Sequence, residues 1–309
     1  MIAAILVLIV ALVVLFACLI GRGTCSNATQ IGFHPTNTPA PEQSETPEDS
    51  ATPAIETPII LTMPPETFTV DPTQPAASAG PMPTAPTLPQ SPYPSIPYCV
   101  TEGTMEDVHA RLEALKRLPA GETIILLDVG HGGFDGGTVG IDTGATEADI
   151  NLQIARMVAQ RLAAKGYFVF MTRMGEYACA GDKNADMRWR TQVMKLGIFD
   201  ASISIHQNAL DTDRNVRGAR IYCYRTGTEG EKLAKCIIGE FTQISSYAKT
   251  NPYTGNLMVV REPVCPSALI ECGFLSNPEE ELLLQDPNYQ AQIAQAAANG
   301  VENYLKGGN

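Results

Sequence analysis

Two histidines and one glutamate each stand at the end of a short apolar run: His131, His206 and Glu271. Apolar runs of this kind predict buried strands. In open α/β sheets, the functional site lies beyond the carboxyl ends of the strands. We therefore expect these three side chains, which are far apart in the sequence, to meet at one edge of a sheet.

A second carboxylate, Glu147, opens a helix-like stretch between the two histidines. Two histidines and a glutamate are the ligand set of a catalytic zinc ion that keeps one position for water. Asp149 lies in the same first turn, and spacing alone does not choose between Glu147 and Asp149, since either could instead favour the helix dipole. Glu271 is more unusual, because a carboxylate on a buried strand is costly unless it is paired or functional. The pattern predicts a zinc hydrolase.

Predicted strands and helices alternate along the part of the chain that carries these residues. Such alternation is typical of an α/β fold, with a mostly parallel, twisted sheet of about six strands and helices on both faces. We expect strands at residues 124–129, 167–171, 201–205, 219–224, 257–260 and 268–270, and helices at 106–117, 147–165, 183–196, 229–242, 278–284 and 289–305.

Composition divides the 309 residues into three parts, of which the first is apolar. No charged residue occurs from residue 2 to residue 20, a run long enough to cross a bilayer as a helix. We interpret residues 1–25 as an uncleaved transmembrane anchor. A cleaved signal segment is the alternative, although no Lys or Arg follows Met1. The stretch Leu15-Phe-Ala-Cys18 also loosely resembles a lipoprotein signal.

The second part, residues 26–98, contains 17 of the 23 prolines and neither Lys nor Arg. Each proline removes a backbone donor and fixes φ, and too little apolar surface is present to offset the entropy of ordering. We predict a disordered, extended Pro/Thr/Ser-rich linker. Residues 99–309 are then the catalytic domain. The net charge of −12 and the lack of a basic patch exclude nucleic acid as a partner.

The eight cysteines form no CxxC pair, so a zinc ribbon is not indicated. Export would permit disulfides, but their connectivity does not follow from the sequence. Cys223 and Cys272 lie within predicted strands, where we expect buried apolar side chains rather than bridges.

Five motifs, in this order and at these spacings, resemble the zinc-dependent N-acetylmuramoyl-L-alanine amidases of the Amidase_3 type. The resemblance covers about residues 123–305, which is nearly all of the globular part. The motifs are DVGHGG at 128–133, EADINL at 147–152, MTR at 171–173, SIHQN at 204–208 and LIECGFLSNP at 269–278.

The resemblance implies a role for each candidate residue. His131, Glu147 and His206 match the family's ligands of Zn2+, which favours Glu147 over Asp149. Glu271 matches the family's catalytic glutamate. These assignments imply a hydrolase that cleaves the amide between N-acetylmuramic acid and the L-alanine of the stem peptide in peptidoglycan.

The sequence does not decide the roles of two arginines. Arg190 matches a family arginine that usually precedes an Ala-Asn pair, which is replaced here by Met194 and Lys195. Arg173 could bind a substrate carboxylate or pair within the protein. Asp128, which precedes the first histidine, could orient a ligand.

Three functions are compatible with the sequence. The leading one is a monomeric amidase of the bacterial cell envelope, tethered to the membrane by its N-terminal helix, with its catalytic domain outside the cytoplasm. A zinc peptidase or carboxypeptidase that acts on stem peptides is a second. The third is a cell-wall-binding module without activity, but the complete set of histidines and glutamates speaks against it.

Overall fold

The protein was analysed as a computed structural model, which describes residues 84–245 and 248–308. All of them belong to the second of two compact units, Asp71–Asn309. The predicted membrane segment at residues 1–25 and residues 26–83 of the predicted linker lie outside the described residues. Within the described ranges, no helix combines the length and the apolar character needed to span a membrane.

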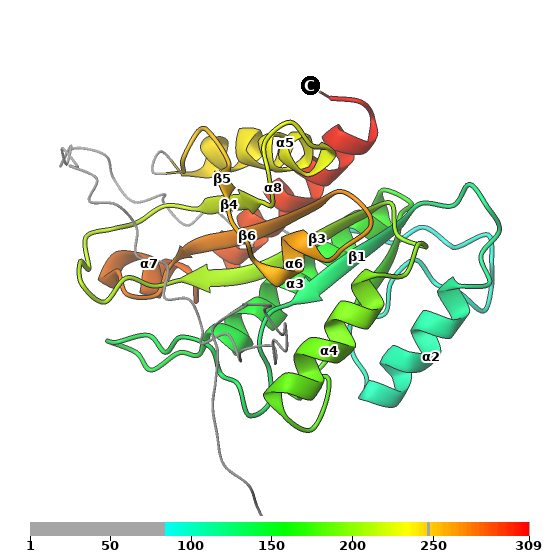
Figure 1. The fold of residues 1–309 in the computed structure, drawn as a ribbon, viewed down its shortest axis with the longest axis horizontal. Helices are drawn as coiled ribbons and strands as arrows, with labels where there is room; N and C mark the ends of the chain where they lie inside the picture. Colours follow the sequence, from blue (N-terminus) through cyan, green and yellow to red (C-terminus); the bar gives the residue numbers. More distant parts are fainter. Residues whose placement is uncertain (1–83, 246–247, 309) are drawn as a thin grey trace, which may run out of the picture. The chain divides into compact units, whose positions relative to one another are not determined.

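A six-stranded sheet in the order β2-β1-β3-β6-β4-β5 forms the centre of the domain (Figure 1). The four strands from β2 to β6 run parallel, whereas β4 is antiparallel to β6 and parallel to β5. The expectation of a mostly parallel α/β sheet is confirmed. The strands are β1 (Ile124–Val129), β2 (Phe168–Met171), β3 (Ala201–Asn208), β4 (Arg220–Cys223), β5 (Tyr253–Thr254) and β6 (Ser267–Phe274).

Helices cover both faces of this sheet. Figure 1 shows α4 and α6 in front of it and α3 and α8 behind it, and α5 packs against α8. Because both faces are covered, central strands must be apolar on both sides, and all six residues of β1 are buried. The helices are α2 (Met105–Leu115), α3 (Glu147–Ala164), α4 (Lys183–Met194), α5 (Glu229–Ile244), α6 (Met258–Arg261), α7 (Pro278–Leu283) and α8 (Pro287–Leu305).

Three of the predicted strands differ clearly from the structure. The strand predicted at residues 257–260 is wrong, because residues 258–261 form the short helix α6 and the strand β5 comes earlier. A four-residue apolar run does not distinguish a helix from a strand. In addition, β3 and β6 extend further than predicted, so that His206 and Glu271 lie within them as direct partners in the register.

The last residues of the predicted linker pack against the domain. Ile96 is buried, the ring of Tyr98 packs at a tilt against that of Phe168 of β2 with ring centroids 4.7 Å apart, and the Tyr93 hydroxyl donates to Glu122 at 2.7 Å. The packed part of the chain therefore begins before the predicted boundary at Cys99, since aromatic and apolar side chains interrupt the proline-rich composition there.

The crossing of α5 and α8 depends on a glycine. A Cβ on Gly300 of α8 would lie 2.5 Å from the Cα of Ile237, so the two backbones approach too closely for any side chain. We expect G300A to lower the free energy of unfolding by about 1–3 kcal/mol through overpacking, as measured by denaturant unfolding of the full-length chain.

Gly239 supplies the matched control for this prediction. It also lies in a helix, α5, but a Cβ there would meet nothing within 4 Å. G239A should leave stability unchanged or raise it by about 0.5–1 kcal/mol, because alanine loses less conformational entropy in a helix. Equal stabilities for the two variants would contradict the assignment of Gly300 as a close contact.

Candidate active site

The first candidate ligand, His131, leaves β1 in an unusual conformation. Its φ is +59°, and it is the one non-glycine residue with positive φ in the described part of the chain. Such a backbone is strained and persists only where the surroundings enforce it. The His131 carbonyl is turned inward, where it accepts a hydrogen bond from Arg190 Nη2 at 2.9 Å.

Three candidate side chains converge beyond the end of β1. The Glu147 Oε1 atom lies 3.1 Å from His131 Nε2 and 2.8 Å from His206 Nδ1. One atom from each of the three residues can be chosen so that all lie within 4.8 Å of one another. The structure thus brings together the two histidines and the glutamate that the sequence singled out.

A missing side chain makes room for the second histidine. A Cβ on Gly130 would lie only 2.4 Å from the His206 imidazole. Gly130 N also donates to the carbonyl of Ile205 at 3.2 Å, which joins the end of β1 to β3 immediately before His206. Close approach of the two strands at this point therefore requires glycine.

The structure also distinguishes the two carboxylates of the first turn of α3. Thr146 is the N-cap, and its hydroxyl accepts from the backbone of Asp149 and donates to the Asp149 carboxylate at 2.6 Å. Asp149 is exposed in this capping role. Glu147 is 3% exposed, and its side chain faces the two histidines.

Several donors surround the Glu147 carboxylate. Oε1 accepts from Gln207 N at 3.1 Å and Oε2 from Thr138 N at 2.9 Å. Although burial alone would raise it, the two imidazoles hold the pKa of Glu147 well below its usual range. The carboxylate is thus kept ionised in a buried place, which is the state a metal requires of its ligand.

Glu271 lies beside this group on the neighbouring strand, opposite His206. Its Oε2 atom is buried and has no hydrogen-bond partner among the described residues. Burial, and then the nearby Glu147 carboxylate, raise the pKa of Glu271 well above its usual range. A carboxyl group with these properties holds a proton far more readily than a solvated glutamate does.

Comparison with known proteins identifies the family to which this chain belongs. The family model described as N-acetylmuramoyl-L-alanine amidase (Amidase_3) matches residues 125–303, which is more than half of the chain. The chain belongs to this family. Its activity is therefore that of a peptidoglycan hydrolase that cleaves the bond between N-acetylmuramic acid and L-alanine, which favours the leading hypothesis over the peptidase and the binding module.

Individual relatives agree with this assignment. The germination-specific N-acetylmuramoyl-L-alanine amidase of Bacillus subtilis is 34% identical over 197 residues, which cover 61% of this chain and 82% of the relative. The amidase AmiC of Neisseria meningitidis is 32% identical over 219 residues, covering 59% of this chain and 52% of AmiC. The structure of the CwlD amidase from Clostridioides difficile in complex with the GerS lipoprotein matches with a TM-score of 0.56 and 29% identity, covering 60% of this chain and 99% of that one.

The amidase has a further carboxylate at its site that the sequence reasoning missed. Asp135 Oδ2 lies 3.1 Å from Nδ1 of His131, on the far side of the ring from Glu147. Although burial opposes it, the nearby carboxylates of Asp135 and Glu147 raise the pKa of His131 to about 9. A carboxylate behind a histidine orients the ring and raises its basicity as a ligand. The glycine-rich setting of Asp135, four residues after His131, was the available signal.

Asn151 was also missed, although it belongs to the same motif as Glu147. Its Nδ2 lies 3.3 Å from the Gly130 carbonyl and 3.4 Å from Glu147 Oε1, and its Oδ1 accepts from Gln207 Nε2 at 3.1 Å. Asn151 is four residues after Glu147 on α3, a spacing that places two side chains on the same helix face.

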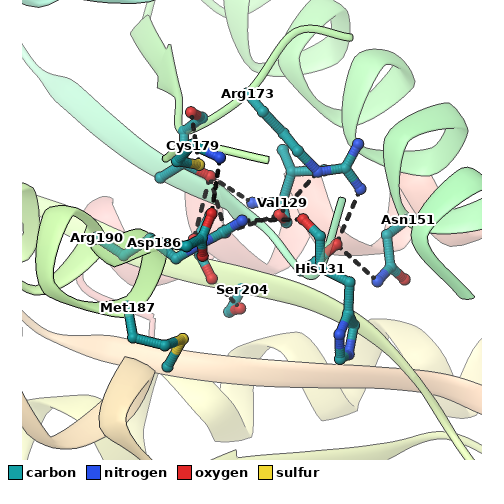
Figure 2. Close-up of polar contacts among 12 residues, drawn as sticks. Val129, His131, Asn151, Arg173, Cys179, Asp186, Met187, Arg190 and Ser204 are labelled. Atoms are coloured by element: carbon teal, nitrogen blue, oxygen red, sulfur yellow. Dashed lines mark hydrogen bonds and ion pairs between the residues drawn. The ribbon is translucent and has the colours of Figure 1, made fainter. Parts of the chain in front are cut away.

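Arg190 lies behind the site in a buried ionic group rather than at the substrate. Its guanidinium donates to Asp186 and Asp128, at 2.7 Å in each case, and to the carbonyl of Val129 at 2.8 Å (Figure 2). Asp128 accepts a further bond from Ser204 at 2.6 Å. Although burial opposes it, Arg190 lowers the pKa of Asp128, so both side chains are ionised. Through its bonds to Asp128 and Val129, Arg190 holds the end of β1 in place.

Two neighbouring carboxylates of α7 hold the loops that border the site. Glu281 is fully buried and accepts from Asp142 N at 3.1 Å and from Thr143 N at 2.7 Å, in the loop that leads into Glu147. Glu280 is 4% exposed and accepts from Gly218 N at 2.8 Å, and from the end of β6. α7 therefore ties both loops to the sheet.

The environment of Glu280 predicts a pH-dependent stability. Burial raises its pKa from 4.5 to about 7, although the amides of Phe274 and Gly218 oppose the shift. Because the folded state binds this proton more tightly than the unfolded state does, the contribution to stability is fully present below the unfolded-state pKa. It is lost as the pH rises through the folded-state pKa of about 7. Relative to E280Q, the wild-type chain should lose about 3 kcal/mol of unfolding free energy between pH 4.5 and 8, as measured by urea unfolding.

The adjacent Glu281 should show the opposite sign. Although burial opposes it, the bonds from Thr143 and Asp142 lower the pKa of Glu281, so its contribution is present at neutral pH and lost as pH falls through the folded-state pKa. E281Q should therefore be less stable than wild type at pH 7 and approach it in acid. Parallel pH profiles for wild type and E280Q would exclude the raised pKa of Glu280.

Proposed function

We propose that this amidase hydrolyses its substrate with a zinc ion held by His131, Glu147 and His206, and with Glu271 as the acid–base group. One observation carries the proposal. Three potential ligand atoms converge within 4.8 Å beside a buried carboxyl oxygen of Glu271 that has no partner among the described residues.

The side chains that are present fit a zinc ion. Two imidazole nitrogens and one carboxylate oxygen are a known catalytic donor set, which leaves a fourth position for water or substrate. Glu147 is ionised and buried, and both imidazoles already face its carboxylate. Asp135 would steady the first imidazole from behind.

Glu271 would move the proton during hydrolysis. A bound zinc ion supplies activation of the attacking water and polarisation of the scissile carbonyl. The Glu271 carboxylate would accept the proton of that water at Oε2 and then donate it to the nitrogen of the leaving L-alanine. Burial of this carboxyl group supports the first step, because it raises the affinity of Glu271 for a proton.

Two variants separate metal binding from proton transfer. We expect E271Q to retain zinc and to lose at least about 100-fold in turnover, because an amide cannot carry the proton. H206A should lose both zinc and activity. Metal content is measured on the purified full-length chain, and turnover is measured as new N-terminal alanine released from purified sacculi. Near-normal hydrolysis by E271Q, or full zinc content in H206A, would refute the corresponding role.

We also propose that residues 1–25 anchor the enzyme and that a tether connects this anchor to the catalytic domain. The run without charge from residue 2 to residue 20 supports the anchor, and the proline-rich composition supports the tether. A polyproline II tether of roughly 65 residues would reach on the order of 200 Å. Such a reach would let one membrane-bound enzyme act across a deep layer of wall.

Cell fractionation tests the anchor. The full-length chain should sediment with the membranes, resist extraction by salt, and retain its N-terminal residues when the intact mass is measured, because an apolar helix of this length stays in the bilayer. Deletion of residues 2–20 should abolish membrane association. A soluble or wall-bound enzyme that begins after residue 20 would show a cleaved signal instead.

A further inference from the structure

Arg173 is a completely buried arginine whose hydrogen bonds all go to main-chain carbonyls. Nε donates to Val129 at 3.2 Å and Nη1 to Gly175 at 2.9 Å, while Nη2 donates both to Gly130 at 2.9 Å and to Ala148 at 2.7 Å. Figure 2 shows the side chain directed toward the backbone of the β1 end. It is therefore not available to a substrate carboxylate.

The two carbonyls that share Nη2 belong to the neighbours of two candidate ligands. Gly130 immediately precedes His131, and Ala148 immediately follows Glu147. A single nitrogen atom thus joins the end of β1 to the first turn of α3. Gly130 N also donates to the carbonyl of Ile205, immediately before His206, so the same residue links this connection to the third candidate ligand.

Burial of the charged Arg173 guanidinium costs free energy. Burial, together with the nearby Arg190, lowers the pKa of Arg173 to about 10, which still leaves the group charged at neutral pH. A buried charge is unfavourable unless it is fully hydrogen-bonded. Only a planar guanidinium presents donors in a fixed fork toward several acceptors at once, so lysine could not make the same set of bonds.

We propose that Arg173 is a positioning residue that fixes the spacing between His131 and Glu147 and thereby sets the affinity of the site for its metal. The inference rests on the proposed zinc site and adds to it a residue that touches neither metal nor substrate. Loss of the shared bond would free the first turn of α3 to shift relative to β1, and the carboxylate would shift with it.

The chain contains a matched control in Arg111. It is also buried, at 6% exposure, and also donates to main-chain carbonyls, those of Tyr98 and Val169. These contacts lie at the outer strand β2 and at the segment that pairs with its edge, away from the candidate ligands. R111K therefore repeats the chemical change of R173K without altering the backbone of any ligand.

The test compares zinc affinity with stability in the purified full-length chain. Zinc dissociation constants are measured by competition with a chromophoric chelator, and unfolding temperatures are measured on metal-free protein. The visible spectrum of the cobalt-loaded chain reports the coordination geometry. R173K should bind zinc at least about tenfold more weakly than wild type and should alter the cobalt spectrum. R111K should lower the unfolding temperature but keep the wild-type affinity and spectrum.

The outcomes separate this inference from the proposed function. If R173K and R111K lose stability alike and both bind zinc as wild type does, the positioning role of Arg173 is wrong while the zinc site stands. A folded wild-type chain that binds no zinc would overturn the site itself. R173Q, which removes the charge and keeps an amide donor, gives the same comparison if the buried ammonium of R173K prevents folding.

Discussion

The structure depends on one buried anion, the carboxylate of Glu147. It is held away from water by the strand ends and the first turn of a helix, and it is kept ionised by two imidazoles and two backbone amides. A buried charge of this kind is tolerated only where its partners are in place. The glycine at position 130 and the cap at Thr146 bring those partners within reach.

Chemistry-bearing residues at strand ends were predictable, because apolar runs predict buried strands and the carboxyl ends of parallel strands meet at one edge of a sheet. The choice between Glu147 and Asp149 did not follow from spacing, since it depends on which side chain the threonine cap engages. The sequence also did not reveal the role of Arg173, because its partners are carbonyl groups and leave no mark in the residue types. The helix at 258–261 was missed because four apolar residues carry no period.

The site is supported in layers. Behind His131, the buried side chains of Arg173 and Arg190 donate to the carbonyls at the end of β1, and Arg190 also pairs with the carboxylates of Asp128 and Asp186. On the other side, α7 holds the bordering loops through two adjacent carboxylates. Both sets of side chains bond to main-chain groups around the site and not to the candidate ligand side chains.

The packing of Tyr98 beside β2 has a consequence for the edges of the sheet. β2 is the outermost strand, but its Val169 N–H donates to the Tyr98 carbonyl at 2.8 Å and its Val169 carbonyl is taken by Arg111. At the opposite border, β5 is only two residues long. Bare strand edges invite pairing between neighbouring molecules. Because one edge is covered and the other is very short, neither offers a long unpaired backbone to a second molecule. The fold therefore resists aggregation through edge-to-edge strand pairing, even where copies are concentrated.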